Sequence, residues 1–108
     1  MAVDEELEEK LFEIISNVGG AKSSFIGAIQ AAKVGNFEEA QKLIDEGSKM
    51  FIEGHKVHAY LIEKEMSEAG LKTSLILIHA EDQVIMADMF KTLAGEFIDA
   101  YKHIHAKK

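Results

Sequence analysis

One apolar stretch, residues 75–86 with the sequence LILIHAEDQVIM, contains a histidine, an aspartate and a glutamine. An imidazole can act as a nucleophile near neutral pH, and a carboxylate can bind a hard cation. Moving such groups out of water costs free energy, unless they find polar partners. The pattern therefore indicates His79 and Asp82 as candidate functional residues, with Gln83 as a supporting hydrogen-bonding group.

These side chains separate when the stretch is placed on a helical wheel. Asp82 continues an apolar seam that consists of Leu75, Ile78, Asp82, Ile85 and Met89. A carboxylate on such a seam needs a cation, a hydrogen-bond network or a symmetry axis at which copies of the chain share a site. His79 lies about 60° away around the helix and points into the adjacent groove. Gln83 follows His79 by one turn, so it can hydrogen-bond to His79 or donate to a group bound there, whereas Glu81 is expected on the opposite, solvated face.

Less reactive roles remain open for these and the other histidines. A single histidine on a helix is most often packed or half-exposed without chemistry, and a polar seam residue can serve only to fix register or oligomeric state. His55 and His58 share one helix face, where they could ligate a metal, form a polar patch near His79 or contribute to an interface. Two imidazoles are too few for a closed metal site. We expect His103 and His105 to be solvated.

Composition excludes several classes of function. The formal net charge is −7, and no basic stripe is present for nucleic-acid binding. Cysteine is absent, so a disulfide or a thiolate metal site cannot form. The acidic start MAVDEELEEK does not look like a secretory signal, and no apolar run approaches a membrane span. A cytoplasmic protein without a nucleic-acid partner or direct membrane insertion is therefore expected.

The elements that must position these side chains are helices. Apolar residues recur every three or four positions through nearly the whole chain, and proline is absent. We expect helices at residues 4–33, 37–70 and 73–103. Three long helices joined by tight turns predict an all-α, up-down-up three-helix bundle in a single domain, residues 1–108.

Glycines and capping residues set these boundaries. Gly35 suits the left-handed turn after a helix, and Asn36 can cap the next helix in a capping box. Thr73 or Ser74 begins the third helix. The glycine pair at residues 19–20 predicts a kink or a short break, because a glycine inside a helix costs roughly 1 kcal/mol relative to alanine.

Three further patterns predict packing. Small residues recur every seven positions in the second helix and could let another helix approach closely, namely Ala40, Gly47 and Gly54. A second apolar stripe in the third helix predicts self-association along the bundle, and it consists of Ile76, Ala80, Ala87, Phe90 and Ala94. Four methionines are expected to fill gaps in the core, namely Met50, Met66, Met86 and Met89.

Three segments carry a resemblance to a known family. In chain order they are GGAKSSFIGAIQAAKVGNFEEAQKLIDEG, GHKVHAYLIEKE and LILIHAEDQVIMADM. Together they resemble the enzyme IIA component of the sugar phosphotransferase system (PTS), of the lactose and cellobiose or N,N'-diacetylchitobiose type. The most specific parts are the Ala-Lys-Ser turn, the Gly-Asn-Phe-Glu helix start and the histidine-alanine-acid-aspartate core. The resemblance covers nearly the whole chain.

The resemblance implies an assembly and a reaction. The family forms a homotrimer of three-helix subunits, a nine-helix bundle. The histidine matching His79 accepts a phosphoryl group from the histidine phosphocarrier protein and passes it to a cysteine of enzyme IIB, which phosphorylates a disaccharide taken up through membrane enzyme IIC. The aspartate matching Asp82 faces the threefold axis, where three copies bind one divalent metal, commonly Mg²⁺. Ile76 and Ala80 would then provide docking area for both partners.

Three positions depart from the family's usual pattern. Gly54 and His58 stand where the family usually has an alanine before the histidine of the second helix and a glutamine three residues after it. Gln83 stands where many members have a histidine. If His58 lines the site, we expect transfer rates or partner choice to differ.

Two alternatives from other functional classes remain. The segment MFIEGHKVHA is faintly similar to histidine-containing phosphotransfer domains, with His55 as phosphoacceptor, although the lysine-glycine that normally follows that histidine is missing. A trimeric helical adaptor without chemistry, in which Asp82 only specifies the oligomeric state, is the second alternative.

Overall fold

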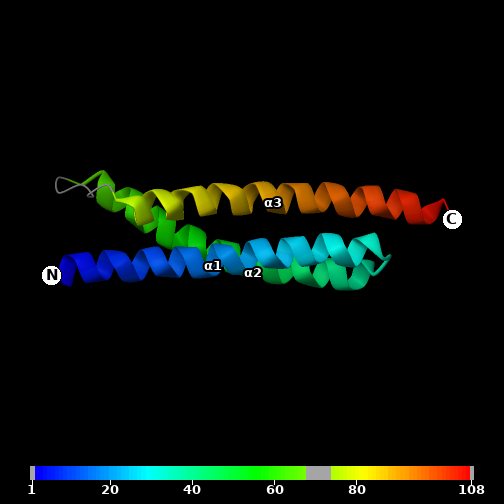
Figure 1. Ribbon diagram of the computed structural model, residues 1–108, viewed down its shortest axis with the longest axis horizontal. Helices are drawn as coiled ribbons and strands as arrows, with labels where there is room; N and C mark the ends of the chain where they lie inside the picture. Colours follow the sequence, from blue (N-terminus) through cyan, green and yellow to red (C-terminus); the bar gives the residue numbers. More distant parts are fainter. Residues whose placement is uncertain (1, 68–73, 108) are drawn as a thin grey trace.

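Three long helices make up the chain. The computed structural model describes residues 2–67 and 74–107, with side chains from residue 5 onward. Helix α1 spans Ala2–Lys33, α2 spans Phe37–Glu65 and α3 spans Leu75–Ala106 (Figure 1). The helices run up, down and up in an elongated bundle with extents of 60 × 19 × 18 Å. The predicted all-α three-helix bundle is therefore confirmed.

The turns between helices are built from the expected capping residues. Gly35 adopts a φ of +84°, a left-handed conformation that favours glycine. The side-chain oxygen of Asn36 accepts a hydrogen bond from the backbone N–H of Glu39 at 3.3 Å. Ser74 caps α3 in the same way, because its hydroxyl accepts from the N–H of Leu77 at 3.2 Å.

The structure corrects two of the predicted boundaries and confirms a single first helix. Helix α1 passes through residues 19–20 without the short break that the glycine pair allowed, because tertiary packing on both sides outweighs the glycine penalty: Val18 and Ala21 are fully buried. Helix α2 ends at Glu65, earlier than predicted, and Gly70 lies outside the described residues. Helix α3 continues to Ala106, beyond the expected end.

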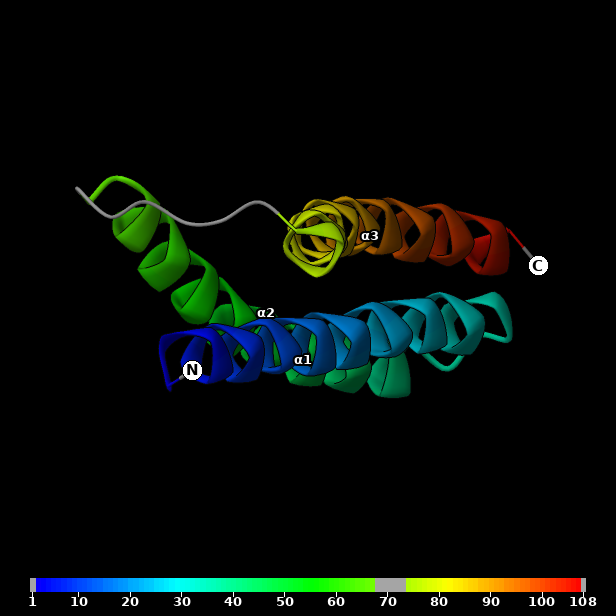
Figure 2. The ribbon, with the colours of Figure 1, turned by 60° about the vertical axis from the view of Figure 1, so that its left-hand side comes forward.

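The row of small residues on α2 packs as predicted. All three members are buried on the side of α2 that contacts α1. A Cβ at Gly47 would lie 2.7 Å from Cε1 of Phe25, and a Cβ at Gly54 would lie 2.7 Å from Cγ1 of Val18. The missing side chains therefore allow α1 and α2 to approach closely along the first part of α2. The C-terminal end of α2 bends away from the line of α1 (Figures 1 and 2).

The core corrects the predicted role of the alanine stripe on α3. Ala80, Ala87 and Ala94 are buried within the subunit. Ile76 and Phe90 are partly buried against the same core. The stripe therefore does not drive self-association, because its small side chains let α3 pack closely against the other two helices. None of the helices over the described residues is both long and apolar enough to cross a membrane.

Candidate functional site

The outward face of α3 carries an exposed apolar seam with a carboxylate in its middle. We call this the α3 seam, and it comprises Leu75, Ile78, Asp82, Ile85 and Met89. Its apolar members are 84%, 49%, 57% and 58% exposed, respectively, and Asp82 is exposed among them. The two side-chain ion pairs among the described residues, Lys56–Glu53 and His58–Glu81, do not involve Asp82. The predicted seam is present, but its carboxylate is solvated in the single chain rather than desolvated.

His79 lies beside the α3 seam on the helical wheel, one turn before Gln83. Its side chain is exposed, so another protein could reach the imidazole. Gln83, one turn later, is half-buried, and its Oε1 accepts a hydrogen bond from Nζ of Lys22 at 3.4 Å. Lys22 belongs to α1 and was not among the predicted site residues. Its only signal in the sequence was its place in the Ala-Lys-Ser motif.

Glu81 and His58 form a contact on the other side of α3. His58 Nε2 lies 2.5 Å from Oε1 of Glu81, and the side chains are 14% and 44% exposed. Glu81 thus keeps part of the predicted exposure to solvent, but it also has a partner that was not predicted, because this side of α3 faces α2. Glu81 lies about 200° around the helix from His79. His58 consequently does not form a polar patch with His79.

His55, the other histidine of α2, does not form a complete metal site with His58. The ring centroids of His55 and His58 are 6.3 Å apart, and both residues line a cleft between α2 and α3 together with Asp88. No group of three or more metal-ligating side chains lies together within residues 5–67 and 74–107. His55 is exposed on α2.

The C-terminal histidines differ from one another. His103 is exposed, as predicted. His105 is half-buried, and its Nε2 donates to the backbone carbonyl of Lys33 at 3.1 Å. Its ring also meets the ring of Phe37 edge-on, with the centroids 5.6 Å apart. The prediction of a solvated His105 is wrong, because the extended end of α3 reaches the turn between α1 and α2.

The structure corrects two further expectations about apolar side chains. Ala80 is only 1% exposed, so it cannot provide the expected docking area, and Ile76 is half-buried against the core, so it can provide only part of its surface. The exposed apolar residues near His79 on α3 include Leu75 one turn before it, Ile78 and Met86. The methionines are exposed rather than core-filling, and these are Met50, Met66, Met86 and Met89.

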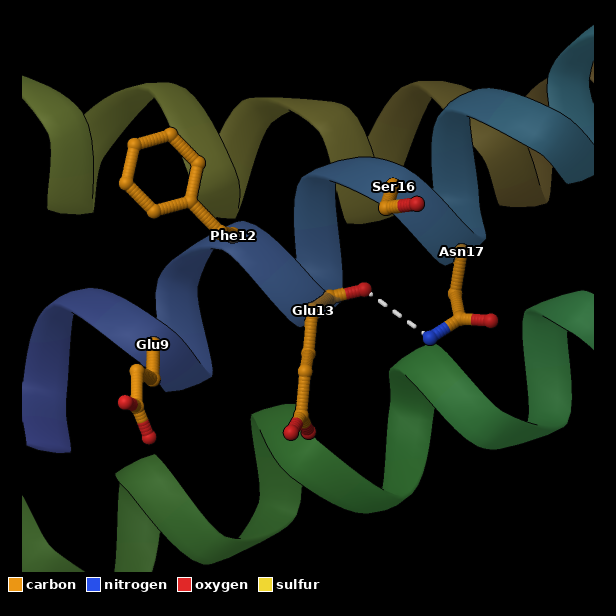
Figure 3. Close-up of a pocket in the computed structure, with 5 residues that line it drawn as sticks. All are labelled: Glu9, Phe12, Glu13, Ser16 and Asn17. Atoms are coloured by element: carbon orange, nitrogen blue, oxygen red, sulfur yellow. Dashed lines mark hydrogen bonds between the residues drawn. The ribbon is translucent and has the colours of Figure 1, made fainter.

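A hollow on α1 holds none of the candidate site residues. It is lined by Glu9, Phe12, Glu13, Ser16 and Asn17 (Figure 3). The Asn17 amide donates to the backbone carbonyl of Glu13 at 2.9 Å. Phe12 points away from the two glutamates, which both extend on the side of α2 (Figure 3).

Known proteins are similar to this chain over nearly its whole length. The family model described as "PTS system, Lactose/Cellobiose specific IIA subunit" matches residues 9–102. The lichenan-specific phosphotransferase enzyme IIA component of Bacillus subtilis is 33% identical, over 94% of this chain and 93% of its own length. The N,N'-diacetylchitobiose-specific EIIA component of Escherichia coli K12 is 34% identical, over 94% of this chain and 88% of its own length.

A solved structure is also similar over nearly the whole chain. The crystal structure of the PTS cellobiose-specific enzyme IIA from Bacillus anthracis superimposes with a TM-score of 0.90 and 37% sequence identity. The match covers 94% of this chain and 93% of that structure. Because the sequence model, the relatives and the fold all agree, the chain belongs to the lactose/cellobiose-specific IIA family of the phosphotransferase system.

Proposed function

We propose that this protein carries phosphoryl groups in a sugar phosphotransferase system, with His79 as the carrier residue. In this proposal His79 accepts the group from the histidine phosphocarrier protein and passes it to a cysteine of enzyme IIB. The observation that supports it most strongly is the exposure of His79 on α3, in a chain of the IIA family. A carrier that meets two proteins in turn needs an accessible nucleophile rather than a deep pocket.

The proposed chemistry is a pair of balanced displacements. The lone pair of a neutral His79 ring nitrogen forms a P–N bond, while the P–N bond of the protonated donor phosphohistidine breaks and its electron pair returns to the donor ring. The donor leaves as neutral imidazole, and the positive charge moves to the phosphorylated His79 ring. A cysteine thiolate of enzyme IIB then forms a P–S bond, and His79 leaves as neutral imidazole. Such transfers depend mainly on in-line positioning and charge stabilisation.

A homotrimer forms the second part of the proposal. The α3 seam leaves four large apolar side chains about half or more exposed along one face of a helix, and contiguous apolar patches of this kind mark interaction sites. Three copies packed through this seam would make a nine-helix bundle, with the Asp82 residues meeting on the threefold axis.

Such an axis would suit a divalent metal, which we propose to be Mg²⁺. One chain supplies a single exposed carboxylate at this position, so the site would be completed only by the three Asp82 side chains together. An all-oxygen ligand set is what Mg²⁺ prefers, and the cation would relieve the repulsion between the carboxylates.

The transported sugar is proposed only as a class. Relatives named for lichenan and N,N'-diacetylchitobiose and the structure named for cellobiose have similar identities of 33%, 34% and 37%. We therefore propose a disaccharide such as lactose, cellobiose or diacetylchitobiose, which membrane enzyme IIC rather than this chain would contact. We further propose that the whole chain, residues 1–108, acts as one IIA domain in the cytoplasm.

Phosphorylation by the purified general components tests the carrier proposal. The protein is incubated with phosphoenolpyruvate, enzyme I and the phosphocarrier protein, and the modified residue is located by mass spectrometry. We expect an acid-labile phosphoryl group on His79, absent from His79→Asn and retained in His55→Asn. Labelling of His55 instead would support a signalling phosphotransfer domain, and a chain that stays unlabelled would support an adaptor without chemistry.

A further inference from the structure

Lys22 on α1 is the cationic side chain that the structure brings next to the candidate site on α3. Its Nζ donates to Oε1 of Gln83 across the interface between the two helices. Both side chains are half-buried. Gln83 lies one turn after His79, so these two residues share a face of α3.

The direction of the helices aims both side chains toward His79. Helices α1 and α3 run parallel (Figure 1). In an α-helix each Cα–Cβ bond tilts toward the N-terminus, so a long side chain covers the turn that precedes it. Lys22 and Gln83 therefore both lean toward the level of His79.

The charge of Lys22 is not neutralised within the described part of the chain. The two ion pairs found there use other residues, and the hydrogen bond of Lys22 goes to a neutral amide oxygen. Two of its three ammonium hydrogens thus stay available. Lys10 on the same helix is different, because its ammonium lies over the ring of Tyr60, 5.4 Å from the centroid, and so faces α2.

The bond from Lys22 also orients the Gln83 amide. An ammonium group has no acceptor, so it selects the amide orientation in which Oε1 faces Lys22. The amide nitrogen, which carries two donor hydrogens, then points away from Lys22. A phosphoryl group on the neighbouring imidazole would present three acceptor oxygens to these donors.

We propose that Lys22 and Gln83 together bind the phosphoryl group carried by His79. The Lys22 ammonium stabilises the phosphoryl dianion and holds the Gln83 amide so that its nitrogen donates to a phosphoryl oxygen. This inference rests on the proposed function, because it assigns residues to the same site. It adds a residue from α1 to a site whose other members all belong to α3.

Titration of the phosphoryl group by ³¹P NMR tests this pair directly. His79 is loaded with potassium phosphoramidate, which needs no partner protein, and its resonance is identified as the one absent from His79→Asn. A nearby cation favours the dianion, so Lys22→Met is expected to raise the protonation midpoint by about 0.5 to 1 pH unit. Lys22→Arg is expected to restore the midpoint, and Lys10→Met, which removes the same charge elsewhere on α1, is expected to leave it unchanged.

The transfer rate gives a second readout that also depends on charge. We expect Lys22→Met to slow phosphoryl transfer from the phosphocarrier protein to His79 by about tenfold. The transfer rate of Lys22→Arg should be close to that of the protein without a substitution. Circular dichroism confirms that each variant keeps its helices. Equal midpoints and equal rates in Lys22→Met and the unmodified protein would overturn the inference. Because chemical loading bypasses the partners, that result is distinct from a failure of the phosphocarrier protein to label His79.

Discussion

At the scale of single residues, the polar side chains near His79 on α3 divide between two sides. Gln83, one turn after His79, accepts a hydrogen bond from Lys22 of α1, whereas Glu81 contacts His58 of α2 on the other side. The departure from the family pattern at His58 is therefore accommodated away from the proposed carrier residue. The His58–Glu81 pair between α2 and α3 can therefore affect the stability of the fold without affecting phosphoryl transfer to His79.

Replacement of His58 tests this division. We expect His58→Gln to keep the rate of phosphoryl transfer to His79 within about twofold of the rate in the unsubstituted protein. His58 contacts the side of α3 that faces α2, and His79 does not lie on that side. The free energy of unfolding should fall by about 0.5 to 1 kcal/mol, as expected when a partly exposed pair is lost. Stopped-flow transfer assays and urea titrations at one protein concentration measure both quantities. A tenfold loss of transfer rate with unchanged stability would contradict the assignment.

The sequence predicted some of these residues and could not predict the others. His79, Asp82 and Gln83 lie close together in the sequence, and periodicity alone placed Asp82 on the seam and His79 with Gln83 in the neighbouring groove of α3. The partners Lys22 and Gln83 are 61 positions apart, and His105 and the Lys33 carbonyl are 72 positions apart. Such contacts depend on how whole helices align, which no local pattern encodes.

At the scale of helices, α3 shows what periodicity leaves open. Two apolar stripes were visible in the sequence, but their spacing did not indicate which stripe faces the core. The structure buries the alanine-rich stripe and exposes the larger residues Ile78, Ile85 and Met89. Small residues permit close helix packing, and the small row on α2 follows the same rule.

Addition of one methyl group at α2 tests the importance of this close packing. A Cβ at Gly47 would meet the Phe25 ring at 2.7 Å, so we expect Gly47→Ala to lower the free energy of unfolding by about 1 to 3 kcal/mol. Gly19→Ala is the matched control, because nothing lies within 4 Å of its added Cβ. It should raise stability by up to about 1 kcal/mol through helix propensity. Equal effects of the two substitutions in urea titrations would contradict tight packing at Gly47.

At the scale of the whole molecule, the single chain leaves much surface uncovered. Its accessible area is 7203 Å², against about 6,000 Å² for a compact monomer of this size. Part of the excess comes from the elongated shape, and part is the apolar α3 seam. Self-association through that seam would bury the large side chains and bring Asp82 of each copy to a common axis.

Substitution of the seam carboxylate separates metal binding from assembly. We expect Asp82→Leu to abolish Mg²⁺ binding in calorimetry, while sedimentation still shows a trimer, because apolar contacts dominate the seam. Asp88→Leu on the side of α3 toward α2 is the control and should keep the metal. Sedimentation of Asp82→Leu as a monomer would show instead that the metal, rather than apolar packing, holds the copies together.

The carrier role of His79 is tested most directly by a single-turnover chase. Protein labelled on His79 by the phosphocarrier system is separated from its donor and mixed with the cognate enzyme IIB. We predict that the phosphoryl group leaves His79 and appears on the enzyme IIB cysteine, and that His79→Asn delivers none. An enzyme IIB that stays unlabelled while His79 keeps its phosphoryl group would contradict the central claim.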